Sequence, residues 1–234
     1  MKTGSKILLC LFVLFSFANP FTLWAKEPIQ EGIYQIVSAQ DPSMVMNADG
    51  QMSPLSNSEH SKWIVTTNKK GKSVIKNLET NQTLKIDGQS WRLTTTKKGV
   101  QIVSDDRYLK LKDGNTTVSD SQSSDWKLVP ASEWQGDVLS ASNGTVVGPN
   151  GKETYYNLDM SVIVSTLQER GFQGNYWERE DGAKMFGEYI LVAANYELHP
   201  YGSIVETSMG MAIVADTGGF AAANPTQIDI ATNW

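Results

Sequence analysis

Two aspartates near the end of the chain stand where strand-like segments should pack into a core. Asp216 closes the segment "AIVAD", and Asp229 stands inside "IDI", 13 positions later. A carboxylate in an apolar strand is costly unless it keeps its proton or accepts hydrogen bonds. Two carboxyls in different surroundings can act as a proton donor and a charged partner at neutral pH. This pair is therefore the candidate for acid–base chemistry.

Both aspartates have local reasons to leave the core. Because strand side chains alternate, Asp229 points away from its two flanking isoleucines, and it faces a groove if these are buried. Asp216 precedes the turn at 217–219, whose backbone amides could hold its carboxylate ionised. The alternative is that both are structural: Asp216 would cap the Gly-Gly turn, and Asp229 would tie strands together.

Few residues are present for other chemistries. The only cysteine is Cys10, and the only histidines are His60 and His199. Without Cys10, which lies in the N-terminal apolar segment, the chain has no cysteine nucleophile, disulfide or cysteine metal site. No glycine-rich phosphate loop precedes a helix. The sequence predicts no metal and no cofactor.

Charge is uneven along the chain. Residues 30 to 130 hold 13 Lys and Arg against 11 Asp and Glu, whereas residues 131 to 234 hold 4 against 13. Such asymmetry indicates two units with different tasks. Phosphate contacts need clustered Lys and Arg, so the acidic half is a poor nucleic-acid binder. We expect no nucleic-acid partner.

The N-terminus has the pattern of a signal peptide. A basic start, "MKTGSK", precedes the apolar run "ILLCLFVLFSF", and "LWA" offers a cleavage site near Ala25. The alternative is an uncleaved anchor with Trp24 at the membrane interface. An exported chain without disulfides favours a bacterial cell envelope or secreted location.

Residues 31 to 130 are rich in short strand signals. Segments such as "GIYQIVSA", "WIVTT" and "VQIVS" are separated by Asp-Gly and Lys-Lys-Gly turns, which is typical of an all-β sandwich or barrel. Trp63, Trp91 and Trp126 each open a strand after a polar pair, at spacings of 28 and 35 residues. This pattern predicts three similar units around a shared aromatic core.

The rest of the chain changes character. Residues 131–144 are polar and rich in Ser and Gly, which predicts a linker. In "NLDMSVIVSTLQERG", Asn157 is a candidate N-cap and Gly171 a stop signal, which predicts a helix, although "SVIVSTL" alone would favour a strand. From Glu188 onward, near-continuous apolar strands predict a small closed barrel. The whole chain is expected to be mainly β.

The first half resembles the ricin-type β-trefoil over residues 30–130. That family ends its repeats in a Gln-x-Trp signature, which "QSW" at Gln89–Trp91 matches, while Trp63 and Trp126 match at the aromatic alone. The resemblance implies carbohydrate binding. However, the family's ligand aspartates correspond to Met46, Lys85 and Lys110. The alternative is a spacer, or a module that contacts a surface protein or the cell wall.

The second half, residues 145–234, resembles the 3D domain, named for its three aspartates. The resemblance rests on the turn His199–Ser203, on "ADTGG" with Asp216 and on "IDI" with Asp229, while the family's first aspartate corresponds to Asn195. The family shares its fold with membrane-bound lytic transglycosylase A. The resemblance implies a small six-stranded double-psi β-barrel with one or two short helices.

The same resemblance implies cleavage of peptidoglycan glycan strands between MurNAc and GlcNAc. Asp229 would be the proton-transferring acid and base, and Asp216 its supporting carboxylate. One carboxyl can serve both steps because the sugar's own 6-hydroxyl closes a 1,6-anhydro ring. The candidate substrate-binding residues are Asn195, Tyr176, Trp177, Lys184, Thr217 and Gly218, with Tyr201 and Arg179 as further contacts. The alternative for the aromatic residues is packing on the barrel.

Three functions therefore stay open from the sequence. The first is a lytic transglycosylase with a trefoil attachment module. The second is a non-catalytic wall- or glycan-binding protein on an expansin-like barrel, which the exchange of an aspartate for Asn195 favours. The third is an interaction protein at the cell surface whose trefoil contacts a protein partner.

Overall fold

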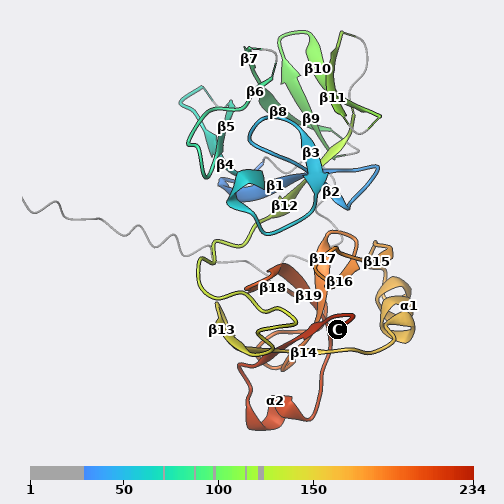
Figure 1. Ribbon diagram of the computed structural model, residues 1–234. Coiled ribbons are helices and arrows are strands. Elements are labelled where there is room, and N and C mark those ends of the chain that lie inside the picture. Colours follow the sequence, from blue (N-terminus) through green and yellow to red (C-terminus); the bar gives the residue numbers. More distant parts are fainter. Residues whose placement is uncertain (1–28, 71, 87, 97–98, 114, 121–123) are drawn as a thin grey trace, which may run out of the picture.

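The structure is a computed structural model that describes residues 29–234 except 71, 87, 97–98, 114 and 121–123. The predicted signal peptide lies outside the described residues. The chain is mainly β, as its sequence predicts, and its strands form two large sheets that follow one another along the chain (Figure 1). Within the described ranges, no helix is long and apolar enough to cross a membrane.

The first large sheet has ten strands, and its central strand β1 pairs with β12, β2 and β4. Strands β6 and β7 form a separate two-stranded sheet. The elements of this half are β1 (Gly32–Ser38), β2 (Met44–Met46), β3 (Met52–Pro54), η1 (Glu59–Ser61), β4 (Lys62–Thr67), β5 (Ser73–Asn77), β6 (Lys85–Ile86), β7 (Gln89–Ser90), β8 (Arg92–Thr96), β9 (Gly99–Ser104), β10 (Arg107–Lys112), β11 (Asn115–Ser119) and β12 (Trp126–Pro130).

The three tryptophans of the first half lie in one hydrophobic cluster. Trp63, Trp91 and Trp126 are all buried, and leucines and isoleucines from several strands surround them. The indole N–H of Trp63 donates to the carbonyl of Met46 at 3.0 Å, and that of Trp91 to the carbonyl of Ile86 at 3.1 Å. Their burial confirms that they are core residues, and it leaves no indole face for stacking on a ligand.

The second large sheet has eight strands and is barrel-like. It mixes antiparallel pairs with two parallel ones, β14 with β20 and β17 with β19. Its strands are β13 (Val146–Gly148), β14 (Gly151–Tyr156), β15 (Tyr176–Glu178), β16 (Lys184–Phe186), β17 (Tyr189–Ala193), β18 (Ile204–Thr207), β19 (Gly210–Asp216) and β20 (Ile228–Ala231). The helices are α1 (Ser161–Glu169) and α2 (Phe220–Ala223).

The two faces of the second sheet pack into different clusters. One face contributes Ile190, Val192, Val214, Ile228 and Ile230 to a cluster that also contains residues of the first half. The other face packs under α1 and contributes Leu191, Ile213, Ala215 and Ala231. Period-two alternation thus divides the apolar residues of β17, β19 and β20 between the two faces. We call the side under α1 the helix face.

Helix α1 confirms the predicted helix but begins later than expected. Asn157 was the expected N-cap, yet the helix starts at Ser161, and the carboxylate of Asp159 accepts from the backbone N–H of Ser161 at 2.9 Å. The side chain of Asn157 instead binds Lys184. At the other end, Gly171 has a φ of +91°, a conformation that suits glycine and ends the helix.

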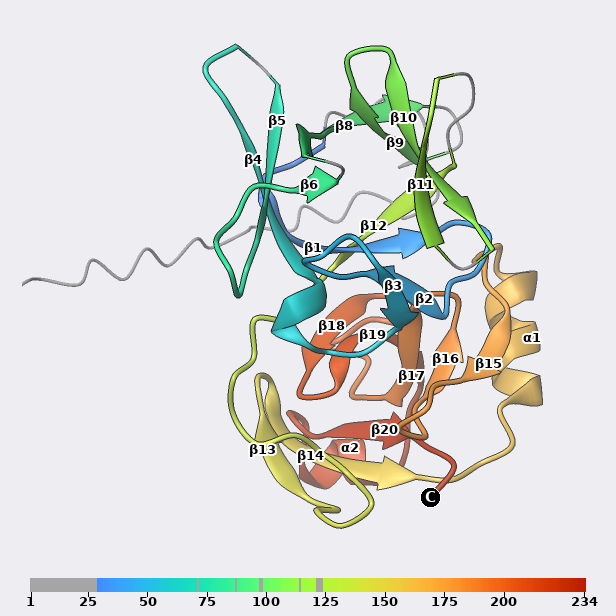
Figure 2. The ribbon, with the colours of Figure 1, turned by 45° about the horizontal axis from the view of Figure 1, so that its top comes forward.

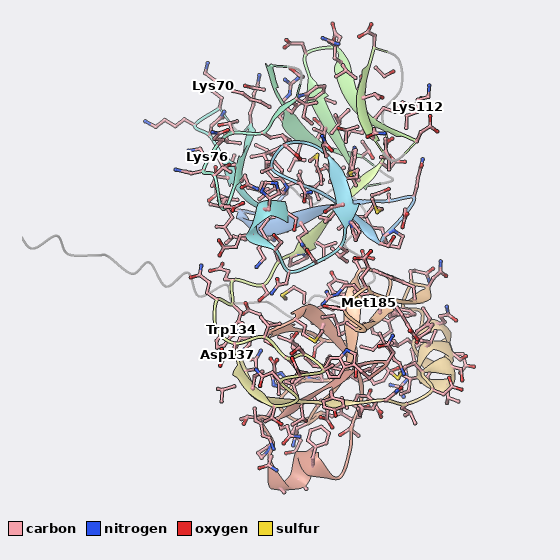
Figure 3. All side chains as sticks on the ribbon, viewed as in Figure 1. Lys70, Lys76, Lys112, Trp134, Asp137 and Met185 are labelled. Carbon is pink, nitrogen blue, oxygen red and sulfur yellow. The ribbon has the colours of Figure 1, made fainter. Side chains whose placement is uncertain are left out.

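The two halves are in direct contact (Figure 2). Their shared cluster includes Val37 and Val129 from the first half. Lys127 and Glu188 form an ion pair across the boundary at 3.1 Å. The connecting segment 131–144 packs along the second half: Leu139 is buried, and its backbone N–H donates to the Ser208 hydroxyl. Trp134 and Asp137 of this segment lie at the outer edge of the second half (Figure 3).

Candidate functional site

The two aspartates singled out in the sequence flank a single residue of the second sheet. Ala193 in β17 is the register partner of Asp216 in the parallel strand β19, and also of Asp229 in the antiparallel strand β20. Because neighbouring strands lie about 4.8 Å apart, the two aspartate Cα atoms are about 10 Å apart. Both side chains are half-buried. Residues opposite one another share a face, so both carboxylates lie on the helix face.

A register shift in the pairing of β17 with β19 places Asp216 in this position. Val192 pairs with Val214, but Ala193 pairs with Asp216 rather than with Ala215. Such an extra residue in one strand redirects the side chains that follow it. The irregularity therefore brings Asp216 opposite Ala193, the residue that Asp229 faces from the other side.

A short hydrogen-bond chain holds the carboxylate of Asp229. The hydroxyl of Thr154, its parallel partner in β14, donates to Oδ1 of Asp229. The amide Nε2 of buried Gln227 donates in turn to the Thr154 hydroxyl at 2.9 Å. Gln227 donates to the oxygen of this hydroxyl, and the Thr154 hydroxyl proton is therefore directed toward Asp229. Thr154 and Gln227 thus fix one oxygen of the carboxylate.

Asp216 is held by the turn that follows it. Its Oδ1 accepts from the backbone N–H of Thr217 at 2.8 Å. Thr217 and Gly218 are exposed, and the Gly218 carbonyl accepts from the N–H of Ala221 in α2. The Thr-Gly-Gly turn therefore gives Asp216 a local partner, as the capping alternative also requires.

Tyr156 is the residue of this site that the sequence did not indicate. Burial, followed by the carboxylates of Asp216 and Asp229, raises the pKa of the Tyr156 hydroxyl. Within the described part of the chain, this buried hydroxyl has no hydrogen-bond partner. Tyr156 lies two residues after Thr154 on β14, so both side chains are on the same face. A neutral phenol is thus placed near both carboxylates.

A second aromatic group borders Asp216. The guanidinium of Arg170 lies 4.2 Å from the ring centre of Tyr201. Tyr196 meets the edge of the same ring, with 5.9 Å between centroids. Asp216 adds to the burial that raises the pKa of Tyr196 and Tyr201. Arg170 therefore covers one face of the Tyr201 ring, whereas Tyr196 is 39% exposed.

Asn195 has a structural role at the position of the family's first aspartate. Its Oδ1 accepts from the backbone N–H of Glu197 at 2.8 Å and of Leu198 at 3.3 Å, which closes a turn. Its Nδ2 donates to the carbonyl of Ala221 at 3.0 Å and so ties this turn to α2. An aspartate would keep the first two bonds but could not make the third.

Two of the expected substrate contacts, Trp177 and Arg179, bind other groups of the protein instead. Trp177 packs against the cluster shared by both halves, and its indole N–H donates to the carbonyl of Gly187 at 2.6 Å. Arg179 is buried, forms an ion pair with Asp181 at 2.7 Å and donates to the carbonyl of Met209. Trp177 thus has the packing role given as its alternative, and Arg179 lacks a free guanidinium for a ligand.

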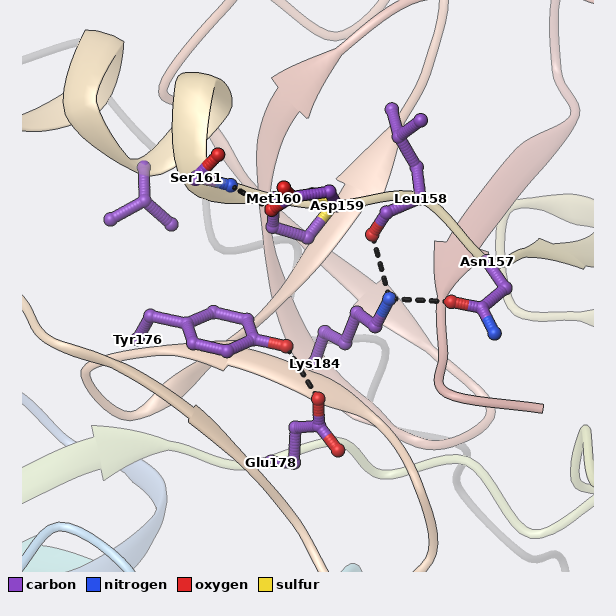
Figure 4. Close-up of a pocket in the computed structure, with 9 residues that line it drawn as sticks. Asn157, Leu158, Asp159, Met160, Ser161, Tyr176, Glu178 and Lys184 are labelled. Atoms are coloured by element: carbon purple, nitrogen blue, oxygen red, sulfur yellow. Dashed lines mark hydrogen bonds between the residues drawn. The ribbon is translucent and has the colours of Figure 1, made fainter.

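Two further expected contacts, Tyr176 and Lys184, line a pocket of about 550 Å³ beside the start of α1 (Figure 4). The ring of Tyr176 is partly exposed there, whereas Lys184 is buried. The Lys184 ammonium donates to Oδ1 of Asn157 at 2.7 Å and to the carbonyl of Leu158 at 2.6 Å. Two of the three N–H groups of Lys184, predicted to bind substrate, are thus used by neighbouring chain atoms.

Comparison with known proteins adds little. No family model matches the chain, and no curated protein matches it. Among solved structures, a mosquitocidal holotoxin is similar at 14% identity with a TM-score of 0.39. That match covers 87% of this chain but 34% of the toxin chain, so this chain spans about a third of the toxin's length.

Proposed function

We propose that this protein is an exported lytic transglycosylase that cleaves peptidoglycan between MurNAc and GlcNAc. In this proposal the second half is a 3D-type double-psi β-barrel, and the first half is a trefoil-like attachment module. The observation that carries it is the placement of Asp216 and Asp229 on either side of Ala193, on one face of the sheet. Two carboxyls that converge in this way suit an acid–base site better than two independent structural bonds.

Asp229 would be the acid and the base. Thr154 donates to its Oδ1, so Oδ2 is the oxygen through which a proton would pass to the glycosidic oxygen. The same oxygen would then take the proton of the sugar's 6-hydroxyl, whose oxygen attacks the anomeric carbon and closes the 1,6-anhydro ring. The fixed Oδ1 keeps the carboxyl oriented between the two transfers.

Asp216 would act through its charge. Its bond to the Thr217 amide would hold Oδ1 in place. A negative charge near the sugar stabilises the positive charge that develops on the ring in the transition state. Tyr156, which burial and the two aspartates keep protonated, would then be a neutral neighbour that does not compete for the role of base.

The test is digestion of purified peptidoglycan. Wild-type protein should release soluble muropeptides that end in 1,6-anhydro-MurNAc, and Asp229→Asn should release none. An Asp229→Asn protein with full activity would remove Asp229 from its assigned role. Digestion by Asp137→Asn serves as the matched control, because Asp137 is exposed in the connecting segment 131–144 and has no role in the proposed site.

The second candidate is a non-catalytic wall-binding protein, and a basic hairpin favours it. Lys69, Lys70, Lys72 and Lys76 are all exposed in or beside the β4–β5 turn, and no Asp or Glu occurs between residues 62 and 78. Figure 3 shows Lys70 and Lys76 on the outside of the first half. This candidate predicts sedimentation with cell walls that weakens with salt, and no soluble sugar released.

A further inference from the structure

The pocket beside α1 is separate from the aspartate pair but lies on the same face of the sheet. Its lining includes Met160 and Val164, which belong to the cluster under α1. It begins at Asn157, three residues beyond Thr154 along the direction of β14. At about 3.3 Å per residue, that separation is about 10 Å. A ligand that reaches Asp229 could therefore extend into the pocket.

The pocket is lined by a buried cation, the ammonium of Lys184, which donates hydrogen bonds to oxygens of the protein. Lys184 is 5% exposed, and two of its three N–H groups donate to Asn157 and Leu158. Among the described residues, the third N–H makes no further hydrogen bond. A buried ammonium with two oxygen partners is a fixed part of the wall. It cannot swing out to collect a ligand carboxylate.

Two carboxylates dominate the open side of the pocket. Asp159 and Glu178 are exposed. Bonds from Ser161 hold the pKa of Asp159 below its usual value, and bonds from Tyr176 and Asn233 do the same for Glu178. Both are thus ionised at neutral pH. With one lysine against two carboxylates, the pocket lining has a net charge of −1.

Apolar surface completes the pocket. Tyr176 is 41% exposed and Leu158 is 49% exposed, and both line the cavity together with Val164. The Tyr176 hydroxyl donates to Glu178 Oε1 at 2.7 Å, which fixes the ring beside that carboxylate (Figure 4). An aromatic face next to a carboxylate suits a cationic group on an aliphatic arm.

We propose that this pocket binds the ammonium group of a peptide side chain, such as that of a lysine-like diamino acid. Glu178 beside the Tyr176 ring receives the ammonium, Asp159 adds negative charge at the same opening, and Tyr176 and Leu158 cover the methylene arm. The remaining N–H of Lys184 takes a peptide carbonyl. The inference rests on the proposed function, because the edge of the pocket at Asn157 is about 10 Å along the chain from Thr154, the strand partner of Asp229, where the peptide of a glycan–peptide substrate could reach it.

The test compares two probes on the wild-type chain: the tripeptide amide Ala-Glu-Lys and the same peptide acetylated on the lysine amine. Binding is measured by titration with amide NMR. We expect the free amine to shift the resonances of residues 158 to 161 and 176 to 178, and acetylation to weaken binding by about tenfold. Equal binding of the two peptides would overturn the proposal, and this comparison requires no variant to fold.

Variants locate the site. The double variant Asp159→Asn, Glu178→Gln removes both charges and leaves one acceptor oxygen on each side chain, and it should weaken binding of the free amine by about tenfold. Glu180→Gln is the matched control, since Glu180 is exposed two residues away and does not line the pocket. An equal loss in the control would also overturn the proposal.

The two proposals can fail separately, because the titration measures binding without turnover. Amine-dependent binding by a protein that forms no anhydro product would refute the proposed function alone. Anhydro product from a protein whose binding ignores acetylation would refute the ammonium site alone.

Discussion

Asp216 and Asp229 lie opposite the same alanine, one from each strand that flanks β17. Neither strand alone creates this relationship. It depends on the register shift at Ala193 and on the antiparallel return of β20. The two carboxylates have different partners, a backbone amide for Asp216 and a side-chain hydroxyl for Asp229. The two aspartates therefore lie on one face of the sheet but have different hydrogen-bond donors. This difference suits the proposal that Asp229 transfers the proton and Asp216 supports it.

Thr154→Val should reduce cleavage without unfolding the protein. Valine keeps the shape of threonine but cannot donate to Asp229 Oδ1, so the carboxyl loses its fixed orientation. We expect the rate of muropeptide release to fall by about tenfold, the size of one lost hydrogen bond to a charged group. Thr145→Val is the control, because Thr145 is exposed and its hydroxyl donates to the carbonyl of the residue before it. An unchanged rate in Thr154→Val would contradict the positioning role.

Tyr156→Phe should leave the protein as stable as before or more stable. The buried Tyr156 hydroxyl finds no hydrogen-bond partner among the described residues, and removing an unsatisfied polar group recovers about 1 kcal/mol or more. Urea denaturation of the two proteins measures this difference. Destabilisation by Tyr156→Phe would show that the hydroxyl makes a bond in solution.

Stability should depend on pH through Glu153. This carboxyl is fully buried, and burial raises its pKa above the ordinary value of 4.5 even though Ser208 donates to it. A raised pKa favours the protonated folded form. The resulting stability is present below about pH 4.5 and is lost as pH rises through the folded pKa. The free energy of unfolding of wild type relative to Glu153→Gln should therefore fall between pH 4.5 and neutrality.

The comparison with Glu153→Gln removes the contribution of the other carboxyls, which both proteins share. A difference in unfolding free energy that stays constant, or that grows with pH, would contradict the direction assigned to Glu153.

Asn195→Asp should destabilise the protein rather than improve it. The substitution restores the aspartate of the resembling family, but it removes the N–H donor to the Ala221 carbonyl and places a charge near that oxygen. We expect a loss of about 1 kcal/mol or more in unfolding free energy. The opposite result would be increased cleavage by the variant with no loss of stability. It would show that the position needs an aspartate and that the hydrogen bond from Asn195 to Ala221 is dispensable.

Local patterns in the sequence predict part of this arrangement. The alternation in "IDI" requires Asp229 to leave the face that buries Ile228 and Ile230, and both isoleucines are fully buried. The tryptophan spacing predicts the aromatic core of the first half, and the end signals predict α1. These features follow from residues close to one another in the chain.

The remainder of the site depends on pairs far apart in sequence. Thr154 meets Asp229 across 75 positions, because β14 and β20 are parallel neighbours. No local pattern marks Thr154 or Tyr156 as members of the site. The sequence predicts Lys184 as a substrate contact, yet the turn after β14 brings two oxygens to its ammonium, and the side chain is buried.

The most direct test of the proposed function is mass spectrometry of muropeptides after digestion of purified peptidoglycan. Wild-type protein should produce fragments one water lighter than hydrolysis products, the signature of a 1,6-anhydro end. Asp229→Asn should bind the same peptidoglycan and produce none of these fragments. Wild-type protein that releases no anhydro fragments, or an Asp229→Asn variant that releases as many, would contradict the assignment of Asp229 as the acid and base.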